Sequence, residues 1–295
     1  MKRKYEWLAA LTAPWLLAAS LPAVAVTTYQ WDVGTCTGSF QSTCTDSSNP
    51  SGGPGVTYSA ISDTGVNFNG LKSLAAAYVV AYGTHLAVTS QAGPNAAANG
   101  TFPYGAGENA PGAQETTASP QHAMDNDGNS EFMLLNFGAT NSVSLSQVTL
   151  GWSQNDSDIT VLAYQGAGAP VLTTGITNYT GTSGLVAKGW SVIGNYSNVC
   201  GSNGSLGCSN GGPASASATI STAISSSYWL IGAYNALGGT ALDSKYDYVK
   251  LLSVAGCAGA GCGGGTGQQV PEPSSLLLAG IALFGLTAMR RRRAV

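Results

Sequence analysis

The sequence predicts an all-β fold, a single β-sandwich or jelly-roll-like domain, and three observations lead to this prediction. Short runs in which apolar and polar residues alternate recur along much of the chain. Segments rich in Gly, Asn, Asp and Ser, which favour turns, separate these runs. Between the two chain ends, no run has the 3.6-residue period of an amphipathic helix. The roughly 245 residues between the terminal segments suit one large all-β domain.

In the first half of this domain, residues 29–33 alternate as a first strand does, and the Gly-, Ser-, Thr- and Pro-rich segment after them is predicted to be a loop. Residues 56–61 and 75–88 are predicted strands, because β-branched and aromatic side chains favour the pleated backbone. Residues 90–120 have no sustained period and are predicted to form a long excursion from the domain.

The second half has clearer strand patterns. Residues 131–137, EFMLLNF, have the pattern of a buried strand. Residues 142–150 alternate so that Val143 and Leu145 share one face. Residues 158–164 alternate again, which predicts that Ile159, Val161 and Ala163 point inward. The predicted strands 186–196, 228–234 and 246–254 complete the domain, which we bound at residues 26–255.

The N-terminal segment has the three parts of a secretory signal peptide. A basic start at Lys2, Arg3 and Lys4 precedes an apolar run over residues 8–21, and Ala23-Val24-Ala25 follows as a small-x-small cleavage site. We therefore predict that residues 1–25 are a signal peptide cut after Ala25, with the Sec translocon and signal peptidase as partners. An N-terminal membrane anchor is the alternative, and the short apolar run weighs against it.

The C-terminal segment is predicted to insert transiently into a membrane. A Gly-rich linker over residues 256–269 leads to the segment 270–295, in which Pro271, Glu272 and Pro273 precede 14 apolar residues, 276–289. A helix of this length rises about 21 Å, which is short for a bilayer core of about 30 Å. The positive-inside rule predicts that the cluster that follows stays on the cytoplasmic side; it consists of Arg290, Arg291, Arg292 and Arg293.

The order of Val270-Pro271-Glu272-Pro273, the apolar run and the arginine cluster resembles the PEP-CTERM sorting signal of Gram-negative bacteria. This resemblance implies recognition by an exosortase, a multi-spanning membrane protease with a proposed cysteine nucleophile. It implies a precursor tethered to the inner membrane and then released or transferred to the cell surface. The same logic applies to other short hydrophobic tails that are removed after export.

The domain itself also resembles an exosortase-dependent surface protein family. The similar blocks are SPQHAMDNDG at 119–128, GWSQNDSDITVLAY at 151–164, SSYWLIGAYN at 226–235 and DYVKLLSVAG at 247–256. This resemblance implies a presumed role as extracellular matrix or surface material, and it offers no activity that can be carried over to this chain. Residues 26–117 have no resemblance that we can name.

The charge of the domain excludes some functions. Residues 26–271 contain no arginine and only four lysines, Lys72, Lys188, Lys245 and Lys250, against twelve Asp and Glu, which leaves a net charge near −8. Nucleic-acid binding needs clustered Lys and Arg, so no nucleic-acid partner is expected. A domain of this charge is also repelled, as a whole, by anionic lipid.

Six cysteines indicate disulfides, because the signal peptide predicts an oxidising compartment. Six cysteines allow fifteen pairings, and we favour the three that join sequence neighbours. These are Cys36 with Cys44, Cys200 with Cys208, and Cys257 with Cys262. A metal site is disfavoured because the spacings are not C-x-x-C and no histidine lies nearby.

Two aspartate-rich stretches are candidate calcium ligands. Asp125, Asp127 and Asn129 alternate in the first stretch, and Asp156 and Asp158 alternate in the second. Calcium loops gather oxygen ligands with this spacing, although the EF-hand pattern is not met, and the two stretches would share one ion if their strands are neighbours. The alternative is that Asn126-Asp127-Gly128 and Asn155-Asp156-Ser157 are simply turns. No other cofactor is expected.

No catalytic set is recognisable. His85 and His122 are the only histidines, and no G-x-S-x-G motif accompanies them, so we expect no enzyme and keep a hydrolase as a remote alternative. Trp31, Trp152, Trp190 and Trp229 lie in strand-like runs, where core packing is the usual fate. We therefore expect a surface or extracellular-matrix protein, associated with a biofilm or an exopolysaccharide, with a carbohydrate-binding module as the alternative.

Overall fold

The structure of the protein is a computed structural model. It describes residues 27–33, 36, 42–46, 52–66, 72–82, 85–89, 123–126, 130–172, 184–201, 208, 216–234, 242–243, 245–259 and 262, and every structural statement below concerns these residues. All of them belong to one compact unit, Val26–Gln268. The signal-peptide residues Ala23 and Ala25, the tail residues 270–295, Asp127, Asn129 and His122 lie outside the described residues.

The described residues form thirteen strands and one 3₁₀ turn, η3 (Val186–Lys188), which confirms the all-β prediction. In the first half of the chain the strands are β1 (Thr28–Asp32), β2 (Thr43–Asp46), β3 (Val56–Val66), β4 (Lys72–Tyr82), β5 (His85–Thr89) and β6 (Met124–Asp125). In the second half they are β7 (Glu131–Asn136), β8 (Val143–Asn155), β9 (Ile159–Tyr164), β10 (Trp190–Tyr196), β11 (Ala216–Thr219), β12 (Tyr228–Ala233) and β13 (Asp247–Ala258).

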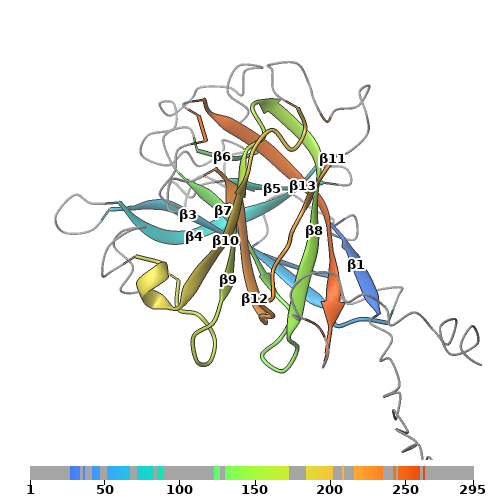
Figure 1. The fold of residues 1–295 in the computed structure, drawn as a ribbon. Helices are drawn as coiled ribbons and strands as arrows, with labels where there is room; N and C mark the ends of the chain where they lie inside the picture. Colours follow the sequence, from blue (N-terminus) through green and yellow to red (C-terminus); the bar gives the residue numbers. More distant parts are fainter. Residues whose placement is uncertain are drawn as a thin grey trace, which may run out of the picture. The chain divides into compact units, whose positions relative to one another are not determined.

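The strands pair in one continuous sheet with the order β10-β9-β12-β7-β3-β4-β5-β13-β8-β11, and β1 and β6 add to β13 while β2 adds to β3 (Figure 1). Every one of these pairings is antiparallel. Strand β4 joins the two halves, because Ala77 pairs with β3 whereas Tyr78 already pairs with β5. The expected two sheets of a sandwich are therefore linked through a shared strand.

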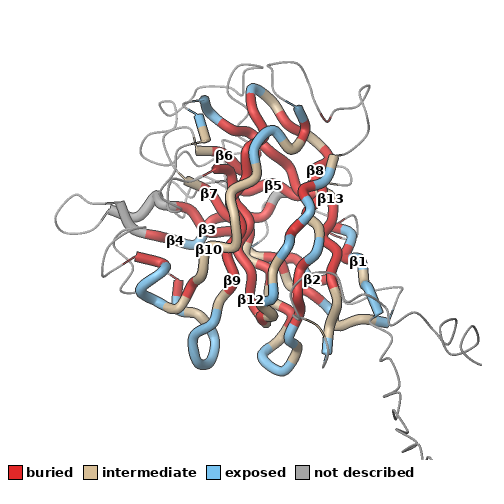
Figure 2. Tube along the Cα trace, viewed as in Figure 1, coloured by how far each residue is buried: buried red, intermediate tan, exposed pale blue. Residues whose placement is uncertain are grey.

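The main core lies between the two halves of this sheet (Figure 2). Tyr58 and Trp229 from one half and Trp31 and Leu150 from the other belong to the same buried cluster. The inward positions predicted in β9, Ile159, Val161 and Ala163, are in this cluster, as are Val143 and Leu145 of β8. Alternation in the sequence therefore identified the core face of both strands.

In the half of the sheet that contains β9, β12 and β7, the strands are buried on their other face as well. Phe132, Leu162 and Leu230 form a second cluster, to which Leu172 and Leu185 contribute from the chain between β9 and β10. This explains why residues 132–135 are apolar without interruption, and it confirms the prediction of a buried strand there.

Several element boundaries differ from the sequence predictions. The predicted strand 75–88 is a hairpin of β4 and β5, and β8 continues to Asn155, five residues beyond its predicted end. Strands β2 and β11 were not predicted, because TCTD and ASAT have no large apolar side chain. Gly256–Ala258, which we placed in the linker, belong to β13, since Gly256 pairs with Leu145 and Ala258 with Val143.

All three local disulfides are present, as predicted. The Cα–Cα distance is 5.7 Å for Cys36–Cys44, 5.4 Å for Cys200–Cys208 and 5.7 Å for Cys257–Cys262. Each closes a loop of only a few residues, so each constrains the unfolded chain by a few kcal/mol at most. Within the described part of the chain, no helix is both long enough and apolar enough to span a bilayer.

Candidate functional site

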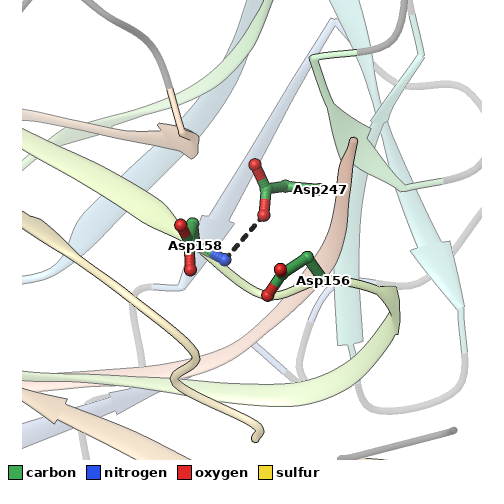
Figure 3. A group of neighbouring side chains, drawn as sticks. All are labelled: Asp156, Asp158 and Asp247. Carbon is green, nitrogen blue, oxygen red and sulfur yellow. Dashed lines mark hydrogen bonds between the residues drawn. The ribbon is translucent and has the colours of Figure 1, made fainter. Parts of the chain in front are cut away.

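Three buried aspartates meet at the end of the sheet where β13 begins (Figure 3). Asp156 and Asp158 lie in the connection from β8 to β9, and Asp247 is the first residue of β13. Their exposed fractions are 2%, 1% and 0%. One carboxylate oxygen from each lies within 4.8 Å of the others, so the cluster could hold a cation or share a proton.

A tight turn places Asp156 and Asp158 on this end. Asn155 has φ of 64°, in the left-handed region that Asn tolerates better than most residues. Its side-chain Nδ2 donates to the backbone oxygen of Tyr246 at 2.8 Å, which ties the turn to the chain just before β13. The turn that we predicted at Asn155-Asp156-Ser157 is therefore confirmed, and it is also what brings the carboxylates together.

The carboxylates accept hydrogen bonds from segments far apart in the sequence. Asp247 Oδ1 accepts from the backbone N–H of Asp158 at 2.8 Å, and its Oδ2 accepts from Asn126 Nδ2 at 2.8 Å. Asp158 Oδ1 accepts from the backbone N–H of Asn198 at 2.6 Å. Together these bonds fasten β6, the β8–β9 turn, the chain after β10 and the start of β13 to one another.

Asn126 is the centre of this network. Besides donating to Asp247 Oδ2, its Nδ2 donates to the backbone oxygen of Tyr234 at 2.9 Å. Its Oδ1 accepts from the backbone N–H of Asp247 at 2.8 Å. The side-chain amide of Asn126 therefore satisfies buried backbone groups at the ends of both β12 and β13, as buried polar groups require.

The charge of the cluster is only partly compensated. Lys245 Nζ lies 3.1 Å from Asp156 Oδ2 and 3.5 Å from Asp243 Oδ2, with its side chain 45% exposed. Burial, reinforced by the charges of Asp158 and Asp156, raises the pKa of Asp247 to about 8. Burial is also the main reason that the pKa of Asp158 is raised. A raised pKa of this size favours the protonated form of Asp247 at neutral pH.

Of the two predicted calcium stretches, the structure places the second in the cluster and the first beside it. Asp156 and Asp158 are in the cluster, whereas Asp125 pairs with Tyr248 of β13 and its neighbour Asn126 makes the contact instead. Asp247 was missed by the sequence analysis. The one available signal was an aspartate at the start of a predicted strand, which is too common to single out a ligand.

The tryptophans follow the core interpretation in three of four positions. Trp31, Trp190 and Trp229 are buried, and the indole N–H of Trp31 donates to the backbone oxygen of Pro54 at 2.7 Å. Trp152 is half-buried, with Lys250 Nζ lying 4.5 Å from its ring centre. His85 lies beside Gly151 on the same half of the sheet, and His122 lies outside the described residues.

The protein is thus an all-β domain with three internal disulfides, and its buried carboxylates accept hydrogen bonds from its own backbone. The family model for the PEP-CTERM protein-sorting motif matches residues 269–293. The chain therefore carries this sorting motif, as the order of Pro271-Glu272-Pro273, apolar run and arginine cluster predicted. The motif implies an exported precursor, anchored in a membrane and processed by an exosortase. No curated protein and no solved structure matches the chain.

Proposed function

We propose that this protein is a structural or interaction component of a Gram-negative cell surface or extracellular matrix, delivered there by exosortase processing. The observation that carries the proposal is the sorting motif at residues 269–293 behind an all-β domain with three disulfides. Disulfide bonds suit the oxidising space outside the inner membrane. Association with an exopolysaccharide in a biofilm is the specific role that we expect.

A role without catalysis is supported by what the buried carboxylates contact. Each of Asp156, Asp158 and Asp247 accepts a hydrogen bond from a backbone N–H group. A catalytic acid or base needs a free lone pair or proton aimed at a substrate position. These carboxylates instead hold turns and strand ends, which is a stabilising role.

Intact-mass analysis of the protein from its host tests the processing step. The expected product lacks residues 1–25 and the segment that follows the Pro-Glu-Pro motif, and deletion of the exosortase gene restores the longer form. A Glu272→Ala variant should accumulate uncut, while Thr266→Ala in the neighbouring Gly-rich segment should be cut normally. A product that still ends at Val295 in the presence of the exosortase would contradict the proposal.

The matrix role has its own test. Deleting the gene should weaken the biofilm, and the complete gene, but not one encoding Glu272→Ala, should restore it. A glycan array with the purified protein separates an exopolysaccharide-binding role from a purely structural one. Binding to no glycan, together with an unchanged biofilm, would leave the matrix role without support.

A further inference from the structure

The charged side chains of the domain are separated along its strands. We call the end where β13 begins, at Asp247, the acidic end, and the end where β13 stops, at Ala258, the tether end. The 12 residues of β13 put these ends about 35 Å apart. Six described carboxylates lie at the acidic end: Asp125, Glu131, Asp156, Asp158, Asp243 and Asp247. Lys245 compensates part of this charge.

The tether end has the opposite character. The described residues that meet there are 137–143, 220–227, 258–259 and 262, and none of them is charged. Their meeting is shown by three backbone contacts: Phe137 N–H to the oxygen of Ser227, Val143 paired with Ser226, and Ala258 paired with Val143. These segments expose serine, threonine and alanine instead.

One exposed charge among the described residues belongs to this end, and it is positive. Lys188 is exposed just before β10, and β10 begins opposite Tyr164, the last residue of β9. Asp46 is also at this end but is buried, with 2% exposure. Asp32 is exposed, and it lies halfway along β13, opposite Ser253.

Both chain connections leave the domain at the tether end. The Cys257–Cys262 disulfide closes the last turn, and Ser225 Oγ donates to the backbone oxygen of Cys262 at 3.1 Å. Thr28 pairs with Cys257, so the predicted cut after Ala25 would place a positive α-amino group two residues before this end. Figure 1 shows β1 and the end of β13 side by side.

The tether that follows is short. Eight residues, 263–270, connect Cys262 to Pro271, and even when fully extended they reach only about 30 Å. A domain on this tether samples the surface potential of an anionic membrane, which decays over a Debye length of about 8 to 10 Å. Which end approaches the lipid therefore matters electrostatically.

We propose that the tether end is the face that the domain presents to an anionic lipid surface while the precursor is membrane-anchored. The proposal rests on the membrane anchoring stated above. Lys188 and the new α-amino group attract anionic headgroups. The other end, where Asp243 is exposed and the buried carboxylates keep a net negative charge, is repelled, so charge and tether select the same orientation. This orientation directs the acidic end away from the lipid.

Energy transfer from the full chain to a headgroup-labelled lipid tests the orientation. A fluorescent amino acid replaces either exposed Ala223 at the tether end or exposed Tyr246 at the acidic end, in vesicles of phosphatidylethanolamine and phosphatidylglycerol. Transfer from position 223 should exceed that from 246 by at least about two-fold, given the separation of the ends. Roughly 1 M salt, which shortens the Debye length to about 3 Å, should reduce the excess, and vesicles of neutral phosphatidylcholine should show little salt effect.

Two matched substitutions isolate the charge effect. Ser221→Glu adds a negative charge at an exposed serine of the tether end, and Ser197→Glu adds one at an exposed serine of the acidic end. Only Ser221→Glu, alone or with Lys188→Glu, should lower the transfer from position 223. Equal transfer from both positions, or equal effects of both substitutions, would overturn the proposed orientation. Failure of the full chain to float with the vesicles would instead contradict the membrane anchoring on which it rests.

Discussion

The two ends of this sheet are closed by different chemistry. At the acidic end, carboxylates and the amide of Asn126 bind buried backbone N–H groups, so ionisable side chains hold the strand ends together. At the tether end, the hydroxyl of Ser226 donates to the backbone oxygen of Tyr164 and accepts from the backbone N–H of Tyr228, and a disulfide closes the last turn. The stability of one end therefore depends on pH, whereas that of the other depends on steric fit and oxidation state.

This difference separates two tasks that a tethered surface domain has to perform. The tether end has to stay closed where the chain leaves toward the membrane. Its contacts involve no titratable group, so they can keep it closed at any external pH. At the acidic end, buried carboxylates bind backbone N–H groups, so the closure of this end depends on their protonation state. Substitutions at the two ends should consequently differ in whether their effect on stability changes with pH.

Replacing Asp247 by Ala should have the largest effect. The change leaves the N–H of Asp158 and the amide of Asn126 without their acceptor in a buried site, which costs about 3 to 5 kcal/mol. Thermal unfolding of the purified domain measures it. Asp243→Ala removes an exposed acid of the same end and serves as the control, with little change in Tm. Equal Tm values for the two variants would show that the network does not hold this end.

Gly256→Ala tests the steric fit of the tether end. A Cβ at Gly256 would overlap the backbone oxygen of Ser144 on the neighbouring strand, so the two strands would have to separate. We expect a loss of about 2 to 3 kcal/mol, independent of pH. Gly259→Ala is the comparison, because a Cβ there meets open space and only its φ of 100° is strained. A loss at Gly259 as large as that at Gly256 would mean that close strand packing is not the cause.

The acidic end should make stability depend on pH in a definite direction. The pKa of Asp247 is raised to about 8 in the folded protein, above its usual value of 3.8, so the folded state binds the proton more tightly. The resulting stabilisation is fully present below pH 4 and is lost as the pH rises toward 8. Between pH 6.5 and 8.5 the free energy of unfolding should fall by about 2 kcal/mol.

Asp247→Asn is the control for this pH dependence, since the amide keeps the shape and most hydrogen-bonding capacity but cannot ionise. This variant should unfold at nearly the same temperature at both pH values, and denaturation of both proteins at each pH gives the comparison. A wild-type protein that becomes more stable toward pH 8.5 would contradict the proton on Asp247.

The sequence predicted strands in which apolar and polar side chains alternate, and it missed strands that form only through backbone pairing. The inward face of β9 follows from residues 158–164 alone, because period-two alternation is read directly from the sequence. Strand β11 has only small side chains, and it is a strand because its backbone pairs with β8, from Ala216 opposite Leu150 to Thr219 opposite Gln147. Such pairing depends on residues far away in the sequence, so no local sequence pattern predicts it.

The acidic cluster shows the same limit at the level of a site. The turn at Asn155 and the proximity of Asp156 to Asp158 are local, and the sequence predicts both. Asp247 joins them only because β13 pairs with β8 in a register that sets Asp247 opposite Asn155. Asn126 enters through the pairing of β6 with β13, so a side chain next to the predicted ligand Asp125 takes the place of that ligand.

Calcium binding at the acidic end stays a prediction, and its expected effect is the smallest. The ion would have to displace both the proton on Asp247 and the contact between Lys245 and Asp156, so it should bind weakly and better at pH 8.5 than at pH 6. At ten times its dissociation constant, calcium would raise the free energy of unfolding by about 1.4 kcal/mol. Thermal unfolding with calcium or with a chelator measures this shift. Asp247→Asn and the tether-end variant Ser221→Glu are the controls, because only the first should abolish it. A Tm that calcium does not raise at pH 8.5 would mean that the proton and Lys245 are the only cations this cluster holds.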